Sequence, residues 1–301
     1  MARTLVLRPA AKINLTLRVG PARGDGYHDV RTLMQSVAVM DTLTVTARRG
    51  PFALHASGAG VPTDDTNLVS RAAAALWRAL GRDGPPRDAH LKLVKQIPIA
   101  AGLGGGSADA AAALVGLNTI WEARRSPQQL ATIGATLGSD VPFFLQGGTA
   151  LASGRGEEVY PVDDASRFGV VIVKPSFGVA TADAYRWLDE DRAAAVDPGL
   201  PGADAAPARD LDIGWKVGPI ALVNDLQGPV ARRHAEIREI VDALRQAGAR
   251  AAAMTGSGSA VFGLFAEANA PRAARRLQRP TWLVLVSRTL TRREASRRIG
   301  L

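Results

Sequence analysis

Polar and apolar residues alternate near the start of the chain. Residues 12–19, Lys-Ile-Asn-Leu-Thr-Leu-Arg-Val, alternate strictly, which predicts a strand with one buried face. Further extended segments are expected over residues 3–8, 27–35 and 36–48, and a turn over residues 20–26. A break in the last strand is expected near Met40 and Asp41. This run of strands precedes every predicted helix.

Helical periodicity begins at residue 68. Apolar residues share one face of residues 68–80, and the alanine content of residues 108–117 predicts a second helix. Further helices are expected over residues 126–138, 181–190, 229–247 and 270–278, and further strands over residues 90–95, 148–153, 168–174, 250–265 and 281–287. Early strands followed by helices and then by mixed elements predict an α+β fold rather than a repeating βαβ barrel.

Two segments lack this patterning. Residues 193–212 are rich in Ala, Pro, Gly and Asp with little periodicity, which predicts a surface loop. The tail, residues 288–301, carries five arginines, which is more typical of a solvated end than of a binding arm.

A glycine-rich segment, Pro98–Asp109, leads into the alanine helix. Four of its glycines lie between residues 102 and 106, and Ser107 stands where a helix N-cap is expected. A glycine loop that opens onto a helix N-terminus presents unpaired N–H groups and a partial positive charge, so it favours phosphate. The alternative is an ordinary turn. No Gly-Lys-Ser/Thr closes a Walker A loop here, and the dinucleotide spacing is absent.

Composition narrows the class of protein. The 301 residues are enough for two domains, and the chain contains no cysteine, which excludes disulfides and thiolate metal sites. The formal net charge of +9 suits polyanions, but aromatic residues make up only 5%, too few for a base-stacking platform. We therefore expect no nucleic-acid partner. Without a signal peptide or an apolar run long enough for a bilayer, we expect a cytoplasmic enzyme with no membrane partner.

Several single residues could carry chemistry. Lys12 is either a solvated strand end or, in a cleft, a compact cation for a phosphate or carboxylate. Asp140 precedes the apolar run Val141–Leu145, which would remove water from a carboxylate, but the local sequence favours the alternative of a turn or N-cap residue. Tyr27 and His28 could present a flat, hydrogen-bonding surface to a base or form a packed pair. The four histidines are scattered, so no transition-metal site is expected.

A second glycine turn follows at residues 256–258. The apolar run after it has no helix-forming character, which contradicts a dinucleotide fingerprint. A tight turn that lines a cleft fits better.

Taken together, these segments resemble the GHMP kinase superfamily, which binds ATP with a Pro-x3-Gly-Leu-Gly-x-Gly-Ser-type loop such as Pro98–Ser107. The matching segments run in order along nearly the whole chain: residues 9–15, 23–28, 32–35, 65–68, 97–111, 137–144, 224–226 and 254–258. The Gly-Asp-Gly-Tyr-His element, residues 24–28, is the specific part. It is similar to that of the superfamily members that act on a cytidine diphosphate derivative of methylerythritol. Residues 190–215 match little.

The resemblance implies a two-domain fold with the active site in the interdomain cleft. Residues 1–158 would form the N-terminal ATP-binding domain, which is similar to domain 2 of ribosomal protein S5. Residues 159–301 would form an α/β-plait C-terminal domain, whose last segment could pack back on the N-terminal domain. The sequence leaves a monomer and a homodimer open.

The resemblance also implies an activity. ATP with Mg²⁺ would phosphorylate the 2-hydroxyl of the methylerythritol moiety, in the non-mevalonate route to isoprenoid precursors. Asp140 would take the hydroxyl proton while Lys12 holds the two in line. The residues implied for ATP are Asn67, Leu68, Pro98, Gly102, Leu103, Gly104, Gly105, Gly106 and Ser107, with Ser107 also a candidate Mg²⁺ contact. The residues implied for the substrate are Asn14, Tyr27, His28, Tyr185, Gly256 and Ser257.

Two alternatives remain at this point. One is another GHMP small-molecule kinase, acting on homoserine, a mevalonate derivative or a sugar, against which the Tyr27-His28 element argues. The other is a non-catalytic RNA-binding or ligand-sensing protein, suggested by the charge of +9.

Overall fold

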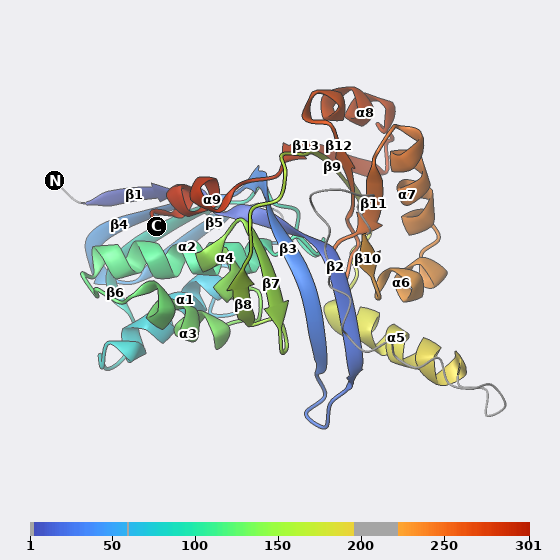
Figure 1. Ribbon diagram of the computed structural model, residues 1–301. Coiled ribbons are helices and arrows are strands. Elements are labelled where there is room, and N and C mark those ends of the chain that lie inside the picture. Colours follow the sequence, from blue (N-terminus) through green and yellow to red (C-terminus); the bar gives the residue numbers. More distant parts are fainter. Residues whose placement is uncertain (1–2, 59, 196–221) are drawn as a thin grey trace.

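The computed structural model describes residues 3–58, 60–195 and 222–301, which form two lobes joined by long strands (Figure 1). The N-terminal lobe contains two sheets. The first has the strand order β1 (Thr4–Leu7), β4 (Thr42–Pro51), β6 (Arg87–Val94) and β5 (Ala53–Ser57). The second has the order β10 (Val223–Asn224), β2 (Ala10–Ala22), β3 (His28–Met40), β7 (Thr149–Ser153) and β8 (Glu158–Pro161). The predicted break near Met40 is confirmed.

Helices α1 (Leu68–Ala79), α2 (Gly105–Ile120), α3 (Pro127–Ala135) and α4 (Val141–Gln146) belong to the same lobe. The centre of its core is α2, in which Ala108–Leu117 are all buried. Small side chains let the helix approach the sheet closely: a Cβ on Gly116 would lie 2.8 Å from Cγ2 of Val45. The predicted alanine helix is therefore confirmed, and its burial fixes the N-terminus of α2 in space.

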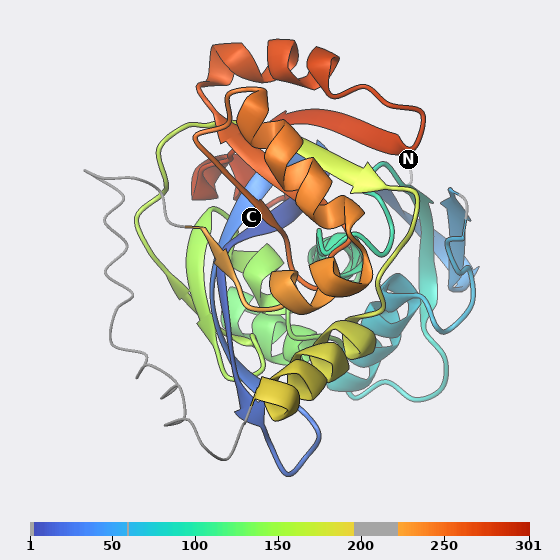
Figure 2. The ribbon, with the colours of Figure 1, turned by 90° about the vertical axis from the view of Figure 1, so that its right-hand side faces the viewer.

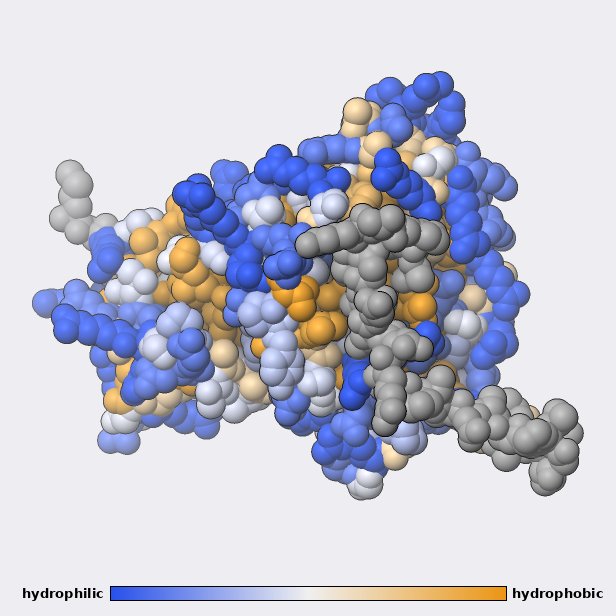
Figure 3. Space-filling view, viewed as in Figure 1, coloured by the Kyte–Doolittle hydropathy of each residue, from blue (hydrophilic) through white to orange (hydrophobic). Residues whose placement is uncertain are grey.

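The C-terminal lobe contains a third sheet, of order β11 (Ala251–Met254), β12 (Val261–Phe265), β9 (Gly169–Pro175) and β13 (Trp282–Arg288). Its helices are α5 (Thr181–Ala195), α6 (Gln227–Arg233), α7 (Glu236–Gln246) and α8 (Ala270–Arg276), with a 3₁₀ turn η1 (Glu267–Asn269) before α8. Figure 2 shows α7 across this sheet and α5 below it. Hydrophilic residues cover the α7 and α8 side of the molecule (Figure 3).

The single helix predicted over residues 229–247 is wrong in one respect. The chain leaves the helical conformation at His234, with φ −134° and ψ 85°, so α6 and α7 are separate helices. The apolar positions of α7 (Ile237, Ile240, Val241, Leu244) are buried as its periodicity predicts. The expected loop over residues 193–212 lies outside the described residues from 196 on, and residues 193–195 form the end of α5.

The expectation that β2 buries one face is also wrong. Its polar residues Lys12, Asn14 and Thr16 are buried too. Their face is covered by residues far away in the chain: Thr255 Oγ1 accepts a hydrogen bond from the backbone N–H of Asn14, at 3.0 Å, and Lys12 N–H donates to Leu103 O, at 3.0 Å. The polar face of β2 therefore lies between the lobes.

The arginine-rich tail is not a solvated end. Residues Arg292–Ile299 form helix α9, which begins with a capping box made by Thr291 and Glu294. Leu290 and Ile299 are buried, and Arg298 O accepts a hydrogen bond from Arg8 N–H at 2.7 Å. The last segment thus packs back on the N-terminal lobe (Figure 1).

Candidate active site

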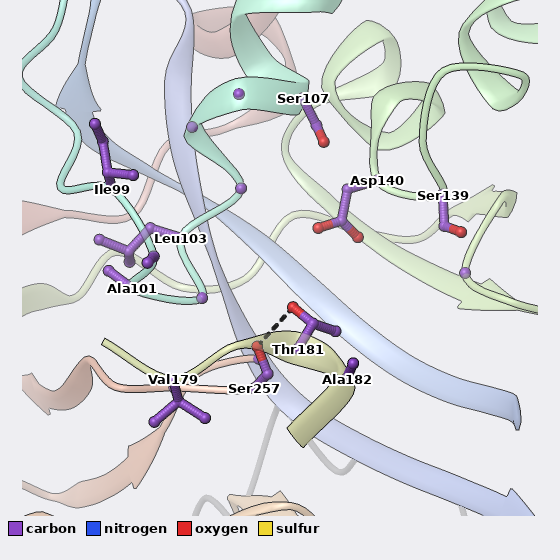
Figure 4. Close-up of a pocket in the computed structure, with 18 of the residues that line it drawn as sticks. Ile99, Ala101, Leu103, Ser107, Ser139, Asp140, Val179, Thr181, Ala182 and Ser257 are labelled. Atoms are coloured by element: carbon purple, nitrogen blue, oxygen red, sulfur yellow. Dashed lines mark hydrogen bonds between the residues drawn. The ribbon is translucent and has the colours of Figure 1, made fainter. Parts of the chain in front are cut away.

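A pocket of about 1020 Å³ lies between the lobes and is lined by both. The glycine loop forms one side, Ser139 and Asp140 lie opposite, and Thr181 at the start of α5 lies beside Ser257 (Figure 4). Every residue that the sequence implied for ATP or substrate lines this pocket. Residues separated by more than 200 positions thus meet in one cavity.

Helix α2 begins at Gly105 rather than after Ser107. Gly104 is the N-cap, in the left-handed conformation with φ 70°, and no side chain caps the helix. The expectation that Ser107 is the N-cap is therefore wrong, because a glycine can adopt this φ and Ser107 falls in the first turn. Among the described residues, the N–H groups of Gly105, Gly106 and Ser107 have no hydrogen-bond partner. They and the helix dipole suit an anion.

Two glycines of the loop have no room for a side chain. A Cβ on Gly102, at φ +74°, would lie 2.1 Å from the backbone oxygen of Thr255. A Cβ on Gly104 would lie 2.6 Å from the ring of Phe144 and 3.1 Å from Cγ of Lys12. The loop thus packs directly on the second glycine turn of the other lobe, and Ala260 N–H donates to Ala101 O at 3.2 Å.

Lys12 and Asp140, 128 positions apart in the chain, form an ion pair of 3.5 Å between Nζ and Oδ2. Lys12 Nζ also donates to Asn14 Oδ1 at 2.6 Å, and the amide of Asn14 donates to Thr32 Oγ1 at 2.7 Å. The lysine side chain is 5% exposed and the aspartate side chain 33%. This pair therefore combines a fixed cation with a carboxylate that faces the pocket.

Asp140 occupies the N-cap position of α4, but its side chain makes no capping hydrogen bond. The carboxylate points into the pocket, away from Ser107 and toward the side where Thr181 and Ser257 lie (Figure 4). Its one-third exposure shows that the apolar run Val141–Leu145, which is buried, does not enclose it. Asp140 therefore stands at an N-cap position, as one alternative expected, but its side chain contacts Lys12 in the pocket, as the other expected.

The other end of the pocket is aromatic. Tyr27 is 54% exposed, and the guanidinium of Arg155 lies 5.0 Å from its ring centroid. His28 is buried, its ring centroid 5.0 Å from that of Tyr185. Burial first, and the charge of Asp140 second, raise the pKa of Tyr185 to about 12. A neutral phenol and two further rings thus surround space that suits a flat, polar ligand.

The remaining predicted residues also have structural partners. Asn67 caps α1 by accepting Val69 N–H at 2.9 Å, and Leu68 is the first residue of that helix. Ser257 and Thr181 share a hydrogen bond between their hydroxyls at 3.1 Å (Figure 4). The turn at Gly256 joins two antiparallel strands, β11 and β12, so the interpretation as a tight turn is confirmed.

A buried ionic cluster that the sequence analysis missed lies under the glycine loop. Lys95 Nζ bonds to Asp109 Oδ2 at 2.6 Å and to Asp41 Oδ2, and both carboxylates are buried. Burial is the main reason why the pKa of Asp109 is raised to about 8; Lys95 opposes the shift and Asp41 adds to it. A Cβ on Gly105 would lie 3.0 Å from Lys95 Nζ. The cluster therefore ties the end of β6 to the first turns of α2.

This cluster predicts a pH dependence of stability. Because the pKa of Asp109 is about 8 in the folded chain and about 3.8 in an unfolded chain, the folded state between these pH values holds a proton that the unfolded state has lost. The free energy of unfolding should therefore fall as pH rises from about 4 through about 8. In urea unfolding between pH 5 and 9, Asp109→Asn should lack this fall, whereas the exposed control Asp163→Asn should keep it. Parallel profiles for wild type and Asp109→Asn would contradict the assignment.

Among the described residues, no group of three or more His, Cys, Asp or Glu side chains is placed to hold a metal ion. Within the same ranges, no helix combines the length and apolar character that crossing a bilayer requires.

Comparisons with known proteins place these features in a family. A family model described as the GHMP kinases N terminal domain matches residues 67–148, and one described as GHMP kinases C terminal matches residues 216–280. A curated relative from Moorella thermoacetica, 4-diphosphocytidyl-2-C-methyl-D-erythritol kinase, is 45% identical over 95% of this chain and 99% of its own length.

Comparison with solved structures points to the same family. A crystal structure of 4-(cytidine 5'-diphospho)-2C-methyl-D-erythritol kinase has a TM-score of 0.73 at 33% identity, covering 95% of this chain and 99% of the other. Homoserine kinase from Cytophaga hutchinsonii has a TM-score of 0.68 at 17% identity, covering 96% and 95%. At that identity the second similarity shows a shared fold alone.

Proposed function

The chain belongs to the GHMP kinase family, and from this membership we propose that it transfers the γ-phosphoryl group of ATP to the 2-hydroxyl of 4-diphosphocytidyl-2-C-methyl-D-erythritol. The observation that carries the proposal is the meeting of three parts in one pocket. The unpaired N–H groups at the start of α2, the Lys12–Asp140 pair and the aromatic end at Tyr27 all line it. Each part suits one portion of the two substrates.

The reacting centre lies at Lys12 and Asp140. Asp140 accepts the proton of the 2-hydroxyl as that oxygen bonds to the γ-phosphorus and the bond from phosphorus to the ADP oxygen breaks. Lys12 orients the carboxylate and neutralises charge, and Asn14 holds Lys12 through the 2.6 Å hydrogen bond. Positioning and charge neutralisation are the main requirements of phosphoryl transfer.

The residues beside the reacting centre divide between the ligands. The loop from Gly102 to Ser107 holds the triphosphate with Pro98 at its start, and Asn67 and Leu68 lie at the adenine. Tyr27, His28 and Tyr185 surround the cytosine, and Gly256 and Ser257 border the acceptor alcohol. We place the N-terminal ATP-binding domain at residues 1–158 and the C-terminal domain at 159–301, although that boundary falls inside β8.

Mg²⁺ fits the donor set of this site. Ser107 presents a hydroxyl to the pocket (Figure 4), and Mg²⁺ takes one or two protein oxygens together with substrate phosphates and water. Ser107 would therefore hold the ion together with the phosphates of ATP, and the ion when bound would neutralise phosphate charge. We place the reaction in the cytoplasm, in isoprenoid precursor biosynthesis.

A substrate panel tests the proposal. Purified chain, ATP and Mg²⁺ are incubated with the cytidylyl substrate, homoserine, mevalonate or galactose, and ADP is measured. We expect ADP only with the cytidylyl substrate, together with a phosphomonoester at the 2-position in phosphorus NMR. The proposal would be overturned if ADP formed with one of the other acceptors, or if no ADP formed with any of the four.

The aromatic end gives a matched prediction. Tyr27→Ala removes a stacking surface worth about 1–3 kcal/mol per base, so KM for the cytidylyl substrate should rise by about 5- to 150-fold. KM for ATP should stay unchanged. Tyr160, a similarly exposed tyrosine that does not line the pocket, provides the control Tyr160→Ala. An equal rise in the KM for ATP and in the KM for the cytidylyl substrate in Tyr27→Ala would contradict the assignment of this end of the pocket to the cytosine.

A further inference from the structure

His28 is held by an acid from the other lobe. Its Nε2 lies 3.0 Å from Oδ1 and 3.1 Å from Oδ2 of Asp189. His28 is the first residue of β3, and Asp189 lies on α5, one helical turn after Tyr185, whose ring also contacts the imidazole. The imidazole is 6% exposed and the carboxylate 41%. The ring therefore has one fixed partner on one of its two nitrogens.

This contact determines which nitrogen carries the proton. A carboxylate can only accept, so Nε2 of His28 must be the protonated nitrogen. In the neutral ring Nδ1 then has a free lone pair and acts as an acceptor. Among the described residues, Nδ1 has no hydrogen-bond partner, and His28 lines the pocket beside Tyr27. An acceptor is thus available to a ligand at the aromatic end.

A hydrogen-bond acceptor at Nδ1 of His28 would discriminate between two pyrimidine bases. Cytosine carries an amino donor at its 4-position, whereas uracil carries a carbonyl acceptor there. We propose that Asp189 is a specificity-determining positioning residue that fixes His28 as an acceptor and so favours a cytidylyl over a uridylyl substrate. The inference deepens the proposed function and rests on it, because it concerns the base of the same substrate.

The test compares two substitutions of Asp189. In Asp189→Asn the amide can turn its NH₂ toward Nε2, which stabilises the tautomer with Nδ1–H as a donor; an Asp→Asn change beside a catalytic histidine acts through the wrong tautomer in the same way. In Asp189→Ala the imidazole loses its partner but gains no such donor. The control is Asp183→Asn, which lies on α5 and pairs with Arg186 instead.

The readout is kcat/KM for the cytidylyl substrate and for its uridylyl analogue. We expect Asp189→Asn to lower the ratio of the two values by about 5- to 150-fold, because Nδ1–H would face the amino donor of cytosine and would instead suit the carbonyl acceptor of uracil. Asp189→Ala should lower it less, and neither should change KM for ATP. Asp183→Asn should match wild type.

Each failure has its own signature. If wild type turns over the cytidylyl substrate and both Asp189 variants lose activity on the two substrates equally, Asp189 only supports α5 and the inference is wrong, while the proposed function stands. An unchanged ratio at full activity has the same meaning. If wild type makes no ADP with the cytidylyl substrate, the proposed function fails and the inference fails with it.

Discussion

Asp140→Asn should reduce kcat by about 10²- to 10⁴-fold while the fold and the KM for ATP stay as in wild type. The size follows from the loss of a general base, which typically contributes that factor. The fold should tolerate the change because Asn has nearly the shape of Asp and the side chain makes no capping hydrogen bond in α4. Its ion pair with Lys12, at 3.5 Å, is long and one third exposed on the acid side, so little stability depends on it.

The measurement is steady-state kinetics together with thermal unfolding. Asp163→Asn, an exposed aspartate outside the pocket, controls for the loss of one surface charge. Turnover of Asp140→Asn within a few-fold of wild type would show that another group takes the proton, or that the hydroxyl loses it to solvent.

Lys12→Met should reduce kcat by a comparable factor for a different reason. The substitution keeps the length of a buried side chain but removes the cation that lies 2.6 Å from Asn14 Oδ1 and 3.5 Å from Asp140 Oδ2. Lys92, an exposed lysine on β6, gives the matched control Lys92→Met, which should be neutral. Because Lys12 is buried, the melting temperature of the Lys12→Met variant must be measured alongside its activity.

The double variant Lys12→Met/Asp140→Asn separates cooperation from independent roles. Groups that act as a unit lose nearly everything in the first substitution, so the double variant should be no more than about 10-fold slower than the slower single variant. Effects that multiply fully would contradict the view that lysine and aspartate act together.

Sequence patterns within one segment predict the helices whose formation depends mainly on interactions within that segment. The alanine content of residues 108–117 predicted α2, and the Ser126-Pro127 start of α3 is a capping box in the structure. The start of α2 was misplaced because Gly104 takes a left-handed conformation and replaces a side-chain cap. The arginines of the tail favour a solvated end, but the Thr291–Glu294 capping pattern in the same segment predicts the helix that the structure shows.

The site depends on contacts that no local pattern reports. Lys12 and Asp140 each had an ordinary alternative, and only the tertiary fold brings them together; the family resemblance supplied that link at the sequence level. The Lys95 cluster was missed because Asp41 lies in a one-residue strand break and Asp109 inside an alanine run. Asp189 had a usable signal, since it follows Tyr185 by four residues and so shares its helix face.

The most direct test is a crystal structure of the chain with a non-hydrolysable ATP analogue and the cytidylyl substrate. The account predicts the 2-hydroxyl within hydrogen-bond distance of an Asp140 oxygen, in line with the γ-phosphorus, with the triphosphate on the N–H groups of Gly105 to Ser107. A 2-hydroxyl held away from Asp140 and Lys12, or a triphosphate bound away from the start of α2, would contradict it.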